Sequence, residues 1–180
     1  MSPWIRNSTS WRAHDVYQIP ANAAVFIDAN IFIYFFTPDP VFGPECQILM
    51  DRICKYQDFA AFTSTHVLSE VSHHLMILET AKLFGWSLAG ITGRLQKHPA
   101  EIQKLSRFRQ AIDEIPRLGI EVLPIERHIL PLAASLAQLH GLLTNDAITA
   151  ATMQDQAIVH IASHDSDFDR VPGLTRYAPV

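Results

Sequence analysis

The sequence predicts an α/β protein built around a mostly parallel sheet. Short, unbroken apolar runs at 23–27 and 157–162 are typical of strands that are buried on both faces. Between such runs lie longer stretches whose apolar residues recur at helical spacing. Acidic residues follow both of these strand candidates, and in parallel sheets functional groups gather beyond the carboxyl ends of the strands. A site at that edge of the sheet is therefore expected.

A single domain is expected to account for most of the chain. Its 180 residues, 48% hydrophobic and 18% charged, suffice for a full core and exclude a disordered chain. Residues 1–21 are polar, and their apolar residues follow neither helical nor strand spacing. We therefore expect an N-terminal extension followed by one domain over residues 22–180. Trp4 and Trp11 in this extension are expected to cover the protein's own surface, with a partner's surface as the alternative.

Composition also predicts a soluble, cytoplasmic protein without a membrane partner. No apolar run approaches the length of a membrane span, and the N-terminus lacks the apolar core of a signal peptide. Cys46 and Cys54 fall in one expected helix, roughly 12 Å apart along its axis, which is too far for a disulfide. Two free thiols suit a reducing compartment.

The expected elements follow from the apolar pattern and from the residues that interrupt it. Strands are expected at 23–27, 59–64, 119–124 and 157–162, with a short final edge strand at 176–179. Helices are expected at 31–36 and 43–57, from Ser64 or Thr65 onward, twice within 86–118 with a break near His98-Pro99, at 129–143, and from Thr144, where the residues suit N-capping.

Four acidic residues are expected to meet at one edge of the sheet. Asp28 follows the first strand, and Asp165 follows the strand at 157–162. Asp146 lies in the first turn of the helix from 144, and Glu70 lies on the apolar stripe of the helix after 59–64. A core-facing carboxylate is costly unless it is compensated, which makes Glu70 unusual. Asp28 alone is explained equally well as a helix cap.

The last acid is drawn from a cluster of three. Asp165 lies nearest the strand end and is our choice, with Asp167 in reserve, and Asp169 is expected to cap a helix or to face solvent. Two carboxylates about 5 Å apart repel by roughly 3 kcal/mol at an effective dielectric near 20, so four together require a counter-charge. An all-oxygen ligand set favours Mg²⁺ or Mn²⁺, and that chemistry predicts metal-assisted phosphodiester hydrolysis.

Other site chemistries find little support. The nine histidines follow no metal-ligand spacing, and no nucleophile elbow or Gly-rich phosphate loop is present. The net charge of −4 argues modestly against a partner bound by charge alone. Basic residues between Trp86 and Leu118 are explained by a solvated helical face, and contact with phosphates is the less favoured interpretation.

The acidic segments resemble the PIN-domain family, most closely the VapC-type toxin ribonucleases of bacterial toxin–antitoxin pairs. The segments that carry the resemblance are Val25 to Ile31, Ser69 to Val71, Leu143 to Ile148 with Ala150-Ala151, and Ile161 to Phe168 with Val171 to Leu174. The third segment is the most specific match. The resemblance covers roughly residues 23–174.

The resemblance implies a three-layer α/β/α sandwich around a sheet of four to five strands, and a Mg²⁺- or Mn²⁺-dependent endoribonuclease. It assigns the metal to Asp28, Asp146 and Asp165, with Asp167 in reserve, and the attacking water to Glu70. It implies that Asn30, Thr144 and Ser163 fix the carboxylates by hydrogen bonds. It also implies an RNA substrate, an antitoxin partner and a homodimer.

Three alternatives stay open at this stage. The protein could be a PIN-like nuclease of RNA maturation without a toxin role. It could be a non-catalytic binding module, although a module has no need of four clustered carboxylates. It could be a phosphatase, which would use a carboxylate-bound metal ion in the same way. The sequence, however, lacks an Asp-x-Asp nucleophile motif after the first strand.

Overall fold

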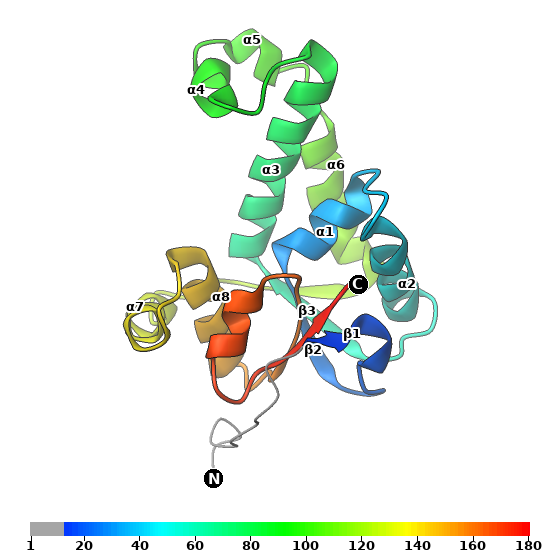
Figure 1. Ribbon diagram of the computed structural model, residues 1–180, viewed down its shortest axis with the longest axis vertical. Helices are drawn as coiled ribbons and strands as arrows, with labels where there is room; N and C mark the ends of the chain where they lie inside the picture. Colours follow the sequence, from blue (N-terminus) through cyan, green and yellow to red (C-terminus); the bar gives the residue numbers. More distant parts are fainter. Residues whose placement is uncertain (1–12) are drawn as a thin grey trace.

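The computed structural model describes residues 13–180, and in this part of the chain six parallel strands form one sheet (Figure 1). The strands are β1 (His14–Asp15), β2 (Ala24–Ile27), β3 (Ala60–Ser64), β4 (Ile120–Leu123), β5 (His160–Ala162) and β6 (Thr175–Ala178). Their order in the sheet is β1-β6-β5-β2-β3-β4. The α/β sandwich is confirmed, and the sheet has one strand more than the four to five expected.

Helices flank this sheet. The α-helices are α1 (Ala29–Phe36), α2 (Gly43–Cys54), α3 (Thr65–Phe84), α4 (Ile91–Gln96), α5 (Pro99–Ile102), α6 (Arg107–Glu114), α7 (Ile129–His140) and α8 (Thr144–Asp155). Short 3₁₀ helices are η2 (Val16–Gln18), η3 (Ile115–Leu118) and η4 (Ser166–Arg170). None of the helices in residues 13–180 is long and apolar enough to cross a membrane.

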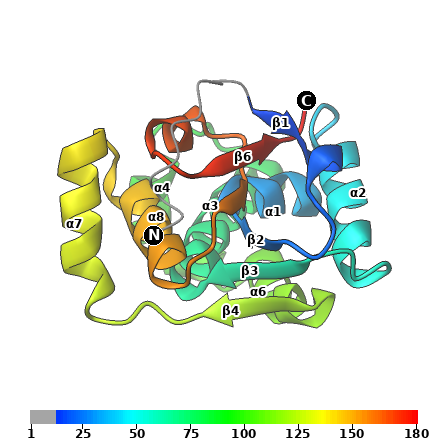
Figure 2. The same cartoon turned by 90° about the horizontal axis from the view of Figure 1, so that it is seen from below.

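The order of the strands reverses direction once along the chain. From β2 the chain adds β3 and β4 on one side, and then it returns across the sheet to place β5 on the other side of β2. Right-handed crossovers therefore put α7 and α8 on the face opposite to α1 and α2. Figures 1 and 2 both show α7 and α8 together on one side of the molecule and α2 on the other. Functional groups gather at such a reversal point.

Two apolar clusters hold these layers together. The larger joins the sheet to α1, α2 and α3, and its centre includes Phe26, Phe32, Leu49 and Leu75. The smaller lies under α7 and α8, where small residues such as Ala150 let the helices approach closely. The alanines of α8 that face this cluster, Ala147, Ala150 and Ala151, are buried.

The first described residues form part of the core. We expected an extension over residues 1–21, but His14–Asp15 pairs with β6, and Val16 and Ile19 are buried at 1% and 3% exposure. No pattern in the sequence indicated this, because a two-residue strand has no detectable period. Trp4 and Trp11, expected to cover a surface, lie outside the described residues.

Two further expectations need correction. The region 86–118 holds three α-helices and a 3₁₀ helix rather than two helices, because new helices begin at Pro99 and at Arg107. The strand expected at the sheet edge, β6, lies between β5 and β1 instead. Cys46 and Cys54 are both free thiols, as their spacing predicted.

Candidate functional site

Asp28 ends β2 and begins α1, so it performs the cap that the sequence suggested. Its Oδ1 accepts a hydrogen bond from the backbone N–H of Ala29 at 2.8 Å, and its side chain is buried. Burial raises the pKa of Asp28 to about 7, against the lowering effect of the bonds from Ser163 and Ala29. The nearby charges of Glu70 and Asp146 raise this pKa further.

A hydrogen-bond network ties Asp28 to the end of β5. Ser163 Oγ donates to Asp28 Oδ2 at 2.6 Å, and Asn30 Nδ2 donates to the same oxygen at 2.7 Å. Asn30 Nδ2 also lies 3.0 Å from Ser163 Oγ, and its Oδ1 accepts from the N–H of His164 at 3.0 Å. Together with the N–H of Ala29, these donors fix both oxygens of one carboxylate. Asn30 and Ser163 therefore lie where the resemblance placed carboxylate partners.

Asp146 lies in the first turn of α8 and faces several other acids. Partial burial, followed by the charges of Asp165, Asp167 and Glu70, raises the pKa of Asp146 to about 6, and Arg170 opposes this effect. The expected N-cap is wrong, because Leu143 holds the cap position and no side chain caps the helix. Asp146 is thus not occupied with holding the helix end.

Thr144 was the third expected carboxylate partner. It is the exposed first residue of α8, and among residues 13–180 its side chain makes no hydrogen bond to the four acids. The structure therefore gives Thr144 no contact of the kind that Asn30 and Ser163 make.

Asp165 and Asp167 both lie close enough to affect Asp146, but their surroundings differ. Asp165 caps η4 by accepting from the N–H of Asp167 at 2.8 Å, and its own N–H donates to Ser163 Oγ at 3.0 Å. Asp167 forms a salt bridge with Arg170 at 2.8 Å. Within the described chain Asp165 has no such cation partner. The contrast supports Asp165 over Asp167 as the fourth acid.

Glu70 lies in the second turn of α3, and its charge acts on Asp28 as well as on Asp146. It is half-buried rather than core-facing, and the buried stripe of α3 runs through Val67, Val71 and Leu75. Its charge raises the pKa of both Asp28 and Asp146. Glu70 therefore faces the acids, which removes the expected conflict with the apolar core.

Three residues near the acids, Asp169, Arg170 and Arg176, form ion pairs that the sequence did not predict. Asp169, expected to cap or to face solvent, pairs with Arg176 at 2.7 Å. Arg170 pairs with Asp167 and donates to the carbonyl of Gly141 at 2.9 Å, joining η4 to the end of α7. The i,i+3 spacing of Asp167 and Arg170 was the one local signal for this contact.

The donor set fits a hard divalent cation. The four acids offer oxygen ligands. Burial and, after it, their mutual charges raise the pKa values of Asp28 and Asp146, so a bound cation would relieve their repulsion. Among residues 13–180, no three His, Cys, Asp or Glu side chains lie close enough to enclose one ion. Mg²⁺ keeps several waters and commonly uses one or two protein carboxylates, so it needs no such enclosure.

The fold and the acids define a parallel α/β protein with an acidic site at the carboxyl ends of its strands. The family model for the PIN domain matches residues 25–174, and the chain belongs to the PIN-domain family. The match includes all four acids of the site.

Known proteins agree with this assignment. Ribonuclease VapC6 of Methanocaldococcus jannaschii is 36% identical over 64 residues, which cover 35% of this chain and 42% of that protein. The chain thus matches less than half of this relative's length.

Two solved structures share the fold. VapC20 of Mycobacterium tuberculosis, described as a toxin that cleaves the sarcin–ricin loop, has a TM-score of 0.54 at 16% identity, over 80% of this chain and 92% of that one. VapBC2 from Rickettsia felis, bound to a DNA fragment from its promoter, has a TM-score of 0.51 at 13% identity, over 86% and 98%.

Proposed function

We propose that this protein is a Mg²⁺- or Mn²⁺-dependent endoribonuclease and the toxin of a toxin–antitoxin pair. The observation that carries the proposal is the meeting of four acids, Asp28, Glu70, Asp146 and Asp165, from four separate segments of the chain. A fold that needed these residues only for stability would gain nothing from placing like charges together.

Asp28, Asp146 and Asp165 would hold the metal, directly or through its bound waters. A bound divalent cation supplies charge for the developing phosphate oxyanion and makes water a better nucleophile near neutral pH. Asn30 and Ser163 keep the Asp28 carboxylate in one orientation, because their donors fix its Oδ2. Glu70, which is half-buried and adjacent to both Asp28 and Asp146, would orient the attacking water and accept its proton.

The names and descriptions of similar proteins support the toxin role and the partners that we propose. One relative is named a ribonuclease, one is described as a toxin that cleaves an RNA loop, and one is a VapBC complex on promoter DNA. By analogy with these relatives the substrate is RNA and an antitoxin protein binds the chain. The homodimer and the cytoplasmic location are proposed from the family resemblance alone.

The test is cleavage of a mixed pool of structured RNA by purified protein in Mg²⁺, Mn²⁺ or EDTA. Asp28→Asn and Asp146→Asn are assayed beside it, with Asp113→Asn as the matched control, since Asp113 is an exposed acid on α6. We expect metal-dependent cutting that both site variants reduce at least 100-fold and the control leaves unchanged. Absence of cutting by wild-type protein freed of any bound inhibitor would favour the non-catalytic module.

A second measurement separates the toxin from an RNA-maturation nuclease. Controlled expression in bacterial cells should arrest growth for the wild type and not for Asp146→Asn. If cells that express the wild type grow normally although the protein cleaves RNA in vitro, the toxin role is excluded and the RNA-maturation nuclease is favoured.

A further inference from the structure

The positive charge of the chain is concentrated in one segment. The basic segment, defined as residues 80–112, holds six of the 14 Lys and Arg residues and one acid, Glu101. Its formal charge is therefore +5, and since the whole chain carries −4, the remaining residues carry −9. In an acidic protein with one strongly basic segment, that segment attracts a polyanion most strongly.

The fold places this segment at the far end of a projection. Figure 1 shows α3 and α6 rising side by side from the sheet, with α4 and α5 joining them at the end remote from the strands. The six cations are all at least partly exposed: Lys82, Arg94, Lys97, Lys104, Arg107 and Arg109. Lys104 pairs with Glu101 at 2.8 Å, and within residues 13–180 the other five form no salt bridge. Their charges are therefore available to a ligand.

Aromatic rings alternate with these cations. The guanidinium carbon of Arg94 lies 3.8 Å from the centre of the Trp86 ring, and Lys104 Nζ lies 5.6 Å from the ring of Phe84. Trp86 also contacts the rings of Phe84 and His98, each at 5.5 Å between centroids. Cations interleaved with ring faces are the combination with which proteins hold single-stranded nucleic acid, through phosphates and stacked bases.

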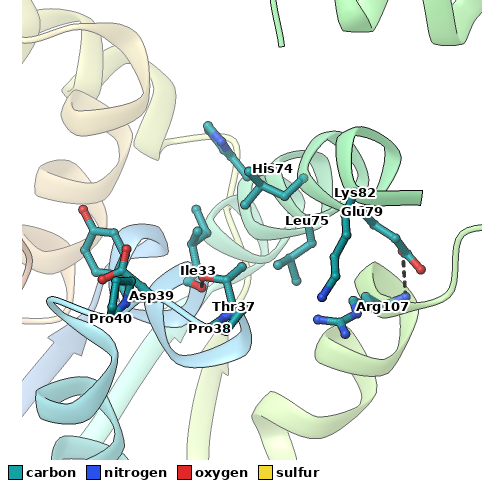
Figure 3. Close-up of a pocket in the computed structure, with 12 residues that line it drawn as sticks. Ile33, Thr37, Pro38, Asp39, Pro40, His74, Leu75, Glu79, Lys82 and Arg107 are labelled. Carbon is teal, nitrogen blue, oxygen red and sulfur yellow. Dashed lines mark hydrogen bonds between the residues drawn. The ribbon is translucent and has the colours of Figure 1, made fainter. Parts of the chain in front are cut away.

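The basic segment also borders a cavity, which Asp39 and Glu79 line together with two cations of the segment. Lys82 of α3 and Arg107 of α6 line a cavity of about 500 Å³, and Figure 3 shows their side chains reaching toward one another at one end of it. Ile33 and Tyr34 of α1, the helix that Asp28 begins, line the same cavity. Two cations of the segment thus lie beside a cavity that α1 also lines.

Helix geometry gives the scale of this arrangement. Glu70 and Phe84 are 14 residues apart on α3, which corresponds to about 21 Å along the axis. A nucleic-acid strand that rises about 3.4 Å per nucleotide covers this distance in about six nucleotides. An extended strand covers more distance per nucleotide, so six nucleotides is the length that a stacked strand needs, and a dinucleotide is too short to reach both places.

We propose that the basic segment is a second RNA-binding element, which holds the backbone and unpaired bases of a substrate while a phosphodiester some six nucleotides away lies at the acids. The inference rests on the proposed function and specifies its substrate class. The segment increases affinity for long RNA and leaves cleavage of short RNA unaffected.

The test compares the double variant Lys97→Glu/Arg109→Glu with Arg127→Glu, which reverses an exposed cation outside the segment. Binding of a labelled 20-nucleotide single-stranded RNA is followed by fluorescence anisotropy in EDTA, over a series of salt concentrations. We expect the double variant to bind at least 10-fold more weakly, with a salt slope reduced by about 0.7 for each phosphate that the protein no longer neutralises. Arg127→Glu should change the affinity less than about twofold.

Cleavage of a dinucleotide RNA, measured in Mg²⁺, separates this inference from the proposed function. The double variant should cut it as fast as the wild type, because a dinucleotide does not reach from the acids to the segment. Wild-type protein that cuts RNA while the double variant binds the 20-mer as tightly as Arg127→Glu overturns the RNA-binding element alone, and an acidic protein partner becomes its ligand. Failure of the wild type to cut any RNA overturns the proposed function, while the EDTA binding measurement still decides the role of the segment.

Discussion

At the scale of single residues, the two aspartates with raised pKa values differ in how the fold treats their charge. Asp28 is buried, but three hydrogen-bond donors satisfy its two oxygens. Asp146 is half-buried, and within the described chain no donor contacts its side chain. Its main neighbours are other negative charges. Asp146 should therefore destabilise the metal-free protein whenever it is ionised.

This difference predicts how stability depends on pH. The pKa of Asp146 is about 6 in the folded protein against an ordinary value of 3.8, so between these values the folded state keeps a proton that the unfolded state has lost. The contribution of Asp146 to stability is thus present below pH 3.8 and is lost as pH rises through 6. In EDTA at pH 7.5, Asp146→Asn should be more stable than the wild type by about 1–2 kcal/mol after allowance for solvent screening.

Urea unfolding at about pH 4 and about pH 7.5 checks the prediction. The gain should nearly vanish at the lower pH, where wild-type Asp146 is protonated in the folded state. Asp113→Asn should show little gain at either pH. A less stable Asp146→Asn at the higher pH would contradict the repulsion between the acids.

At the scale of elements, one buried carboxylate joins the start of α6 to α3. Glu79, near the end of α3, is only 7% exposed. Its oxygens accept from the backbone N–H groups of Ser106 at 3.1 Å and Arg107 at 3.0 Å, at the start of α6. The Ser106 side chain makes no capping bond, so a residue of another helix supplies the cap. The negative charge also complements the positive end of the α6 dipole.

Glu79→Ala should therefore loosen α6 and the adjoining end of the projection. Loss of the cap and of a buried acceptor predicts a destabilisation of about 1–3 kcal/mol. Hydrogen exchange should rise in the first turn of α6, while β2 and β5 stay protected. Glu114→Ala, an exposed acid at the end of the same helix, serves as the control. Equal loss of protection in the projection and the sheet would refute the local role of Glu79.

At the scale of the whole molecule, the sheet is completed at one edge by the start of the described chain. Arg52 of α2 donates to the backbone carbonyls of Val16 and Ile19, each at 2.8 Å, and forms a salt bridge with Asp58. β1 pairs with β6 and leaves β6 without an open edge along the paired residues. Residues 14–19 are thereby joined both to the sheet and to α2.

Val16→Ala tests this contribution to global stability. Val16 is 1% exposed, so removing two methyl groups should lower the free energy of unfolding by about 1–3 kcal/mol. The neighbouring Tyr17 is 51% exposed, and Tyr17→Ala should cost less than about 0.5 kcal/mol. Thermal unfolding of both variants provides the measurement. Equal melting temperatures would mean that this segment does not contribute to the core.

Much of the fold was predictable because its signals are local. The apolar runs that became β2, β3, β4 and β5 and the helical spacing of α3 and α7 depend on neighbouring residues alone. The acids of the site stand directly after such elements or in the first turns of helices, so their convergence followed from parallel pairing. The position of Glu70 was harder to predict, because one helical face borders both the core and the site.

The class of fold, the main strands and helices, and the acids at their ends can be predicted from the amino-acid pattern, since these features follow from patterns a few residues long. Tertiary packing set which strands are neighbours, that β1 covers the edge of β6, and that Glu79 caps a helix whose first residue, Arg107, lies 28 residues later. It also decided that Ser163, 135 residues from Asp28 in the chain, donates to that carboxylate. Such contacts join segments whose separation in sequence carries no periodic signal, and packing of the completed core selects them.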